Sequence, residues 1–234
     1  MRFNDVTVVI PTINEDESIG RLIKLLTSNH QKMSVIVVDD GSTDKTKLIV
    51  TGLGSKNKRV RFYDRKMIGL PKGLTNSMID GLNLSKTKYV IFMDADFQHP
   101  VYLLPKILTQ LENGNNMVIA VRAKVYNQIL YRHIISSLFS TIGSLILASN
   151  QSPTSKDIFS GYFGLERTFA KRKIKINRKR FVGYGYKFLF DLLKSTSLNE
   201  VRKAEIPYTF KARRYGSSKA TFKQGVALLK SFVT

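Results

Sequence analysis

Short, largely apolar runs, in which Arg61 is the one charged residue, alternate with helical patterns through the first half of the chain, and this alternation narrows the possible folds more than any other feature. The runs that read as strands are Val6–Ile10, Val35–Val38, Val60–Tyr63, Tyr89–Met93 and Met117–Val121. The segments with apolar residues at helical spacing are Asp16–Ser28, the stretch through Leu48 and Ile49, the stretch through Met78, Ile79 and Leu82, and Pro100–Leu111. Strands without polar alternation are buried on both faces of a sheet. The sequence therefore predicts an α/β protein whose mostly parallel sheet carries helices on both faces.

Beyond residue 121 the periodicity is weaker. Tyr126–Ala148 and Tyr186–Leu193 favour helices, whereas Phe159–Leu165 and Val201–Phe210 favour extended segments. A chain of 234 residues and 26.6 kDa fits one α/β domain, or one domain with a short appendage.

Positive charge is concentrated in the C-terminal third. The formal net charge is +21; residues 1–150 hold 19 Lys and Arg against 12 Asp and Glu, and residues 151–234 hold 19 against 5. A strongly positive electrostatic potential attracts nucleic acid, an anionic membrane or phosphorylated substrates, and composition alone does not distinguish among these partners. The chain has no cysteine, which excludes disulfides and thiolate metal sites and fits a reducing compartment.

The termini and the longest apolar stretch suggest a protein at the surface of a membrane. Met1 leads within a few residues into a predicted strand, not a cleavable signal, so we expect a cytoplasmic protein. Ile134–Ala148 is 15 residues long and holds several hydroxyl residues, which is short for a span of about 20 residues. We expect it to lie on the cytoplasmic face of a membrane without crossing it.

Acidic residues collect at one predicted edge of the sheet. Asp94 and Asp96 follow the fourth strand two residues apart, so their side chains can project to the same side. At about 4 Å two such carboxylates repel by roughly 4 kcal/mol at an effective dielectric near 20. A shared proton, a basic neighbour or a divalent cation would each offset this repulsion. Beside a phosphate the cation is favoured, and the Gln98 carbonyl can add a ligand. Alternatively, the segment is only a turn before Pro100.

The second strand ends in Asp39, Asp40 and a segment typical of a turn and a helix cap. A carboxylate at this edge can also accept hydrogen bonds from a ribose or a base, and we assign that role to Asp40.

Several segments together resemble the inverting GT-A glycosyltransferases, and most closely the dolichol-phosphate mannose synthases. The segments are Val9–Glu15, Val37–Asp44, Gly69-Leu70, Asp94–Pro100, Ser160–Phe163, Ile206–Phe210 and Gly216–Lys219. The resemblance implies a GT-A, Rossmann-like catalytic domain over residues 1–220, whose C-terminal elements face the acceptor and the membrane. Residues 221–234 would then be a basic, amphipathic tail near the membrane.

The resemblance also implies site residues. The nucleoside would contact Pro11, Ile13, Glu15, Val38 and Asp40. The metal, Mg²⁺ or Mn²⁺, and the diphosphate would be held by Asp94, Ala95, Asp96 and Gln98, with Arg122, Arg213 and Lys219 facing the phosphates. Arg132 and Ser136 would bind the acceptor phosphate, and Asp96 and Arg213 are the expected catalytic residues. The sequence departs from the family at Ile13, where a tyrosine is expected, and at Tyr215 and Ser217.

The implied reaction transfers a hexose, expected to be mannose from GDP-mannose, to a polyprenyl phosphate such as dolichyl phosphate, with inversion. A rival of the same fold would use UDP-glucose or a hydroxyl acceptor in glycolipid or polysaccharide synthesis. A rival of another class is a basic nucleic-acid-binding module. We expect a nucleotide sugar, a lipid phosphate and an anionic membrane surface as partners, and no nucleic acid.

Overall fold

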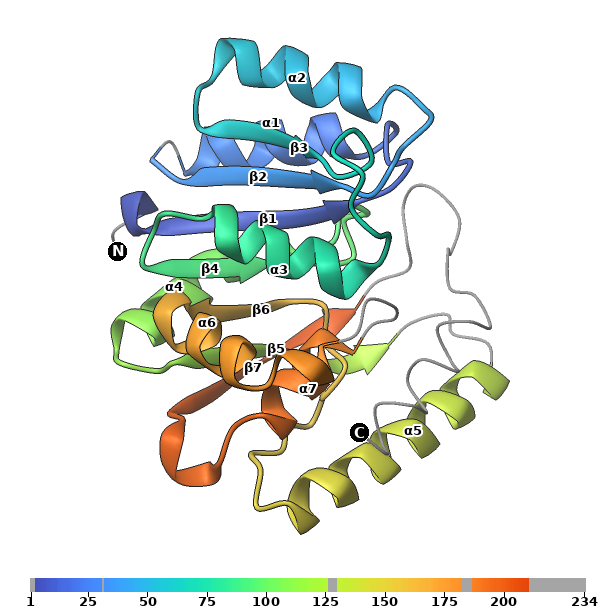
Figure 1. Ribbon diagram of the computed structural model, residues 1–234, viewed down its shortest axis with the longest axis vertical. Helices are drawn as coiled ribbons and strands as arrows, with labels where there is room; N and C mark the ends of the chain where they lie inside the picture. The colour runs from blue at the N-terminus through green and yellow to red at the C-terminus, as the bar shows by residue number, and fades with distance from the viewer. Residues whose placement is uncertain (1–2, 31, 126–129, 182–186, 211–234) are drawn as a thin grey trace.

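The computed structural model describes residues 3–30, 32–125, 130–181 and 187–210. In this part of the chain seven strands form one sheet in the order β3-β2-β1-β4-β6-β5-β7 (Figure 1). The strands are β1 (Val6–Thr12), β2 (Ser34–Asp39), β3 (Val60–Asp64), β4 (Tyr89–Phe92), β5 (Met117–Val125), β6 (Phe163–Glu166) and β7 (Lys203–Phe210).

The first four strands are parallel, as the apolar runs predict. Val9 of β1 pairs with Ile36 of β2 on one side and with Phe92 of β4 on the other. β6 lies antiparallel between β4 and β5, and β7 then runs parallel to β5 at the edge. The prediction of a mostly parallel α/β sheet is confirmed.

Helices cover both faces of the sheet. The helices are α1 (Ile19–Asn29), α2 (Thr46–Lys56), α3 (Leu74–Leu84), α4 (Leu104–Glu112), α5 (Leu130–Ser149), α6 (Arg167–Ile176) and α7 (Phe188–Lys194), with the short 3-10 helices η1 (Phe3–Asp5), η2 (Val101–Leu103), η3 (Arg178–Arg180) and η4 (Leu198–Glu200). Apolar side chains of α1, α2 and α4 form one core with Val8 and Ile10. Those of α3, α6 and α7 form a second core with Val9 and Val38. Alternate residues of β1 thus enter opposite cores, which explains its unbroken apolar run.

Two helices begin later than the sequence pattern suggests. The N–H groups of Ser18 and Ile19 both donate to the Glu15 carbonyl, at 3.2 and 2.9 Å, so the residues before Ile19 form a turn. The predicted helix from Pro100 is divided into η2 and α4. Pro105 lies in the first turn of α4, where its missing N–H costs no hydrogen bond.

α5 extends away from the sheet at the lower right of Figure 1. It packs on the rest of the protein at Gly143 and at Leu147, which is fully buried. A Cβ atom at Gly143 would lie 2.5 Å from Ile158 Cδ1, so a larger residue there would force the Ile158 side chain to move. Within the described ranges, no helix combines the length and apolar character that crossing a bilayer requires.

Candidate active site

The loops after β1 and β2 are joined by hydrogen bonds at the carboxyl edge of the sheet. Asp40 N–H donates to the Thr12 carbonyl at 2.9 Å. Asn14 N–H donates to Ser42 Oγ at 2.8 Å, and Glu15 N–H donates to Thr46 Oγ1 at 2.9 Å. Two of the expected nucleoside-binding segments therefore form one surface.

The two adjacent aspartates at the end of β2 have different partners. Asp39 is 2% exposed, and its Oδ1 accepts the N–H groups of Gly41 and Ser42 at 3.0 and 2.8 Å. Gly41 has a φ of 100°, which favours glycine in this turn. The Asp40 carboxylate instead contacts Arg65 and accepts the Gly73 N–H at 2.7 Å. Asp39 thus holds the turn, whereas Asp40 joins the end of β2 to Arg65 and to the Gly73 backbone.

Arg65 is a buried cation that the sequence analysis missed. It is 2% exposed; Nη1 contacts Asp40, Nε donates to Asp80 Oδ2 at 2.7 Å and Nη2 donates to the Pro71 carbonyl at 2.7 Å. It thereby connects the end of β2, the loop after β3 and helix α3. Its position directly after a predicted strand, at the acidic edge, was the available signal.

The acidic pair after β4 occupies two environments. The Asp96 residue is 2% exposed and its Oδ1 accepts the Gln98 N–H at 3.0 Å, whereas the Asp94 side chain is 31% exposed. A Cβ atom at Gly161 would lie 3.3 Å from Asp94 Oδ2, so this glycine leaves room for the carboxylate. The loop before β6, which contains Gly161, thus borders the Asp94 side chain.

The oxygen atoms of Asp94, Asp96 and Gln98 suit a hard divalent cation. Two carboxylates and the Gln98 amide carbonyl offer only oxygen, which Mg²⁺ and Mn²⁺ prefer. Among the described residues, no cluster of three or more His, Cys, Asp or Glu side chains could hold a metal ion. A cation bound here would therefore need ligand or water oxygens to complete its coordination, as Mg²⁺ does beside phosphates.

His99 is a second residue that the sequence analysis missed. It is 3% exposed, and its Nδ1 accepts the Asp94 backbone N–H at 2.9 Å. Nε2 lies 3.8 Å from Asp94 Oδ2, and the ring stacks on Tyr162 with centroids 4.9 Å apart. Burial lowers the pKa of His99 to about 4, against the opposing charge of Asp96. The neutral ring therefore fixes the backbone of Asp94.

Arg122, the arginine expected to face the phosphates, is held by Asp157. Nε and Nη2 donate to the two Asp157 oxygens, both at 2.7 Å, and the guanidinium lies 5.4 Å from the Phe210 ring centroid. Burial disfavours its charge, but the hydrogen bonds and charge of Asp157 outweigh burial and raise the pKa of Arg122. Asp157 lies 35 positions away in sequence and had no recognisable local signal.

The remaining expected site residues fall into four groups. Pro11 and Val38 pair in register across β1 and β2, and the Val38 side chain is fully buried in the core. Ala95 is 3% exposed between the two aspartates, and Ile13 lies in the loop after β1. Arg132 and Ser136 belong to α5, but their side chains lie outside the described part of the structure. Arg213 and Lys219 lie outside the described residues altogether.

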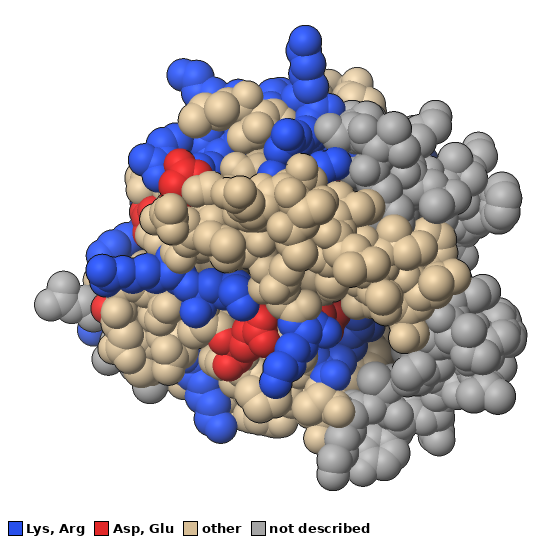
Figure 2. Space-filling model, turned by 90° about the horizontal axis from the view of Figure 1, so that it is seen from below, with Lys and Arg blue, Asp and Glu red and all other residues tan. Residues whose placement is uncertain are grey.

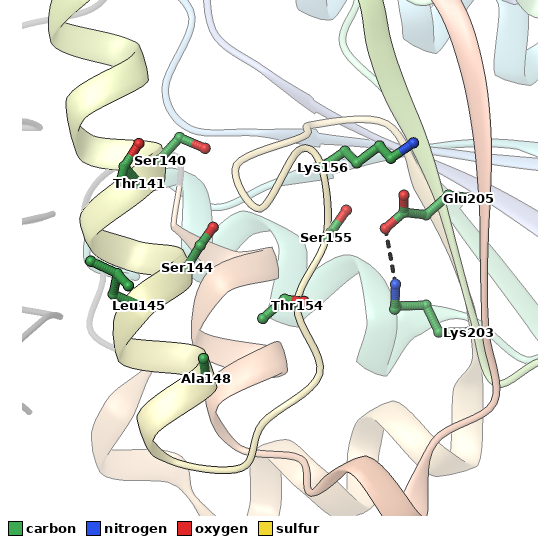
Figure 3. A pocket seen from close by; sticks show the side chains of 10 residues that line it. All are labelled: Ser140, Thr141, Ser144, Leu145, Ala148, Thr154, Ser155, Lys156, Lys203 and Glu205. Atoms are coloured by element: carbon green, nitrogen blue, oxygen red, sulfur yellow. Dashed lines mark hydrogen bonds and ion pairs between the residues drawn. The ribbon is translucent and has the colours of Figure 1, made fainter.

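A separate hollow of about 680 Å³ lies between α5 and β7 (Figure 3). Hydroxyl residues of α5 face the Lys203–Glu205 ion pair, whose charged atoms are 2.9 Å apart, and Lys156 lies at the same hollow. Lys203 and Glu205 pair with Met117 and Ile119, near the start of β5, so this hollow is distinct from the acidic edge.

Known proteins share both the sequence and the fold. A dolichol-phosphate mannosyltransferase of Pyrococcus furiosus is 32% identical over 222 residues, covering 92% of this chain and 58% of that protein. One of Mycosarcoma maydis is 29% identical over 241 residues, covering 97% and 77%. This chain thus spans little more than half the length of the first of these relatives.

Solved structures show the same architecture. Glucosyl-3-phosphoglycerate synthase of Mycobacterium tuberculosis, solved with Mn²⁺, UDP-glucose and phosphoglyceric acid, has a TM-score of 0.63 at 18% identity, covering 97% of this chain and 79% of that chain. The GT-A fold expected from the motifs is confirmed by such neighbours. The model of glycosyl transferase family 2 matches residues 7–173, so this chain belongs to glycosyl transferase family 2.

Proposed function

We propose that this protein transfers mannose from GDP-mannose to dolichyl phosphate, or a similar polyprenyl phosphate, with inversion at the anomeric carbon. The observation that carries the proposal is that relatives named dolichol-phosphate mannosyltransferase match more than nine tenths of the chain at 28–32% identity. Asp40 follows β2 and Asp94 and Asp96 follow β4, the two strands that flank β1, so these residues lie at one edge of the sheet. This arrangement supports a nucleotide-sugar site there.

We infer that Asp94, Asp96 and Gln98 hold Mg²⁺ or Mn²⁺. The oxygen-only donors support this, as does Mn²⁺ in the related-fold synthase of Mycobacterium tuberculosis. When bound, the cation would neutralise charge that develops on the departing diphosphate. We assign Asp96 an orienting or metal-holding role. Its Oδ1 accepts the Gln98 N–H, and this hydrogen bond fixes the orientation of the carboxylate.

The acceptor needs little help to become a nucleophile, since a phosphate is already ionised at pH 7. A single in-line displacement then forms the bond between the acceptor oxygen and the anomeric carbon while the bond to the diphosphate breaks. Arg122 is expected to face the phosphates, and its guanidinium group is held in place by two hydrogen bonds to Asp157. Arg213 is expected to stabilise the leaving diphosphate and Lys219 to assist, both outside the described residues.

We further infer that the protein binds the cytoplasmic face of a membrane through α5, where Arg132 and Ser136 would meet the acceptor phosphate. The exposed apolar residues of this helix are Leu138, Ile142 and Leu145, spaced four and three residues apart. On the face seen from below, Figure 2 shows uncharged surface bordered mostly by lysine and arginine, with a few Asp and Glu residues among them. An apolar helical stripe near basic side chains is typical of an interfacial protein.

The proposal is tested by incubating the full chain with each sugar donor, a polyprenyl phosphate and Mg²⁺ or Mn²⁺. We expect mannosyl transfer from GDP-mannose and a higher melting temperature with GDP. Transfer only from UDP-glucose, or only to a hydroxyl acceptor, would favour the rival transferase. Salt-sensitive DNA binding without any response to nucleoside diphosphates would favour the nucleic-acid module.

A further inference from the structure

One buried hydroxyl group near the acidic edge has no hydrogen-bond partner among the described residues. Tyr208 on β7 is 4% exposed, and its Oη atom neither donates nor accepts a hydrogen bond there. Leaving such a group unpaired is costly, and most buried polar atoms in folded proteins have partners. An unpaired one calls for an explanation in terms of a ligand or an ordered water.

The ring of Tyr208 is fixed by its neighbours. It meets Tyr162 edge to face with centroids 6.1 Å apart, Phe210 at 6.2 Å and His99 at 6.4 Å. Tyr208 also pairs in register with Arg122 on β5, and neighbours in register project to the same face of a sheet. The hydroxyl is therefore held in place before any ligand arrives.

Charged groups of the site surround this ring. Arg122, Asp157, Asp94 and Asp96 all act electrostatically on the hydroxyl. Burial raises the pKa of Tyr208 well above its usual value, so the group keeps its proton and remains a donor. A fixed donor beside the expected metal-binding pair and beside a phosphate-facing arginine suits an anionic oxygen.

We propose that the Tyr208 hydroxyl contacts the bound substrates and donates a hydrogen bond to one of their phosphate oxygens. The inference rests on the proposed function, because a phosphate oxygen could come from the nucleoside diphosphate or from the acceptor monophosphate. Both sources present the same chemistry to a phenol.

Tyr162 provides a matched control in the same aromatic cluster. Its hydroxyl donates to the Pro100 carbonyl at 3.0 Å, so its hydrogen bond is already made in the free protein. Removing the hydroxyl from Tyr162 should therefore lower stability, whereas removing it from Tyr208 should not.

The experiment compares Tyr208→Phe and Tyr162→Phe in the full chain. For Tyr208→Phe we expect an unchanged or higher melting temperature without ligand. We also expect about tenfold to a hundredfold weaker binding of either GDP with Mg²⁺ or a short-chain polyprenyl monophosphate. The ligand whose affinity falls is the one that supplies the phosphate oxygen. For Tyr162→Phe we expect a melting temperature lower by about 2–4 °C and unchanged affinities.

Two results would overturn the inference: Tyr208→Phe binding both ligands as tightly as the wild type, or a melting temperature that falls as far as that of Tyr162→Phe. Failure of the proposed function looks different, because the wild-type protein itself would then bind neither ligand.

Discussion

At the scale of single residues, the acidic pair is asymmetric. Asp96 is buried and shares Oδ1 with a backbone N–H, while the side chain of Asp94 is about one third exposed and its backbone is held by His99. A divalent cation bound with the substrate would reduce the repulsion between the two carboxylates.

We expect Asp96→Asn to weaken Mn²⁺-dependent binding of GDP at least tenfold, because the substitution removes the negative charge and keeps the shape. Calorimetry with GDP and electron paramagnetic resonance of free Mn²⁺ would measure the loss. Asp5→Asn, in η1 at the opposite end of β1, is the control and should leave both values unchanged. Sugar transfer by Asp96→Asn at the wild-type rate in excess chelator would refute the metal site.

A second prediction concerns Arg65, which is buried against Asp40 and Asp80. Arg65→Met would leave both carboxylates without their cation, so we expect a loss of about 3–5 kcal/mol in the free energy of unfolding. The control is Arg61→Met, since Arg61 is exposed and its hydrogen bond to the Leu84 carbonyl is long, at 3.3 Å. Urea unfolding measures the free energy of unfolding of both variants. Equally small losses in the two variants would show that Arg65 does not hold the site together.

The sequence predicted the acidic residues but not the residues that position them. Asp94 and Asp96 stand out because their spacing and their place after an apolar strand are local features. Arg65, His99 and Asp157 act through partners supplied by the folded chain, and Asp157 reaches Arg122 across 35 positions. A single sequence contains no record of such long-range pairings.

At the scale of elements, helix α3 depends on a glycine at its contact with the sheet. A Cβ atom at Gly81 would lie 2.3 Å from Val9 Cγ1 and 3.3 Å from Val38 Cγ2. By contrast, Gly52 in α2 has nothing within 4 Å of the same position. Both residues lie inside helices, so only their surroundings distinguish them.

We therefore expect Gly81→Ala to destabilise the protein by about 1–3 kcal/mol, because α3 must move away from β1. Gly52→Ala should stabilise it by about 0.5–1 kcal/mol, since alanine is the better helix former and meets no obstacle. Chemical unfolding of the two variants checks the pair, and changes of the same sign would contradict the packing argument.

Element types were predictable, but their arrangement was not. The apolar runs predicted β1 to β5, because strands buried on both faces, such as β1, β2 and β4, consist almost entirely of apolar residues. Nothing local shows that β6 inserts antiparallel between β4 and β5, since this choice depends on partners far apart in sequence. Strand order beyond β4 therefore came from the structure alone.

At the scale of the whole molecule, charge and fold serve different purposes. A net charge of +21 says nothing about the sheet, yet the protein gathers acidic residues at the edge where family 2 transferases are expected to bind nucleotide sugars. The excess of lysine and arginine is then free to act on a larger partner. The anionic membrane that we propose as this partner would also cover the exposed apolar stripe of α5.

The final prediction tests this membrane surface. We expect the protein to sediment with anionic vesicles but not with neutral ones, and high salt to weaken the binding, because each basic residue near the surface contributes about 1 kcal/mol that ions screen. Replacing Leu138 and Leu145 together with glutamate should abolish sedimentation, since both side chains are exposed and would carry charge into the interface. Leu48→Glu on α2 is the matched control, because Leu48 is 71% exposed on a different helix. If the wild type fails to sediment at low salt, or if Leu48→Glu binds as poorly as the α5 variant, α5 is not the docking surface.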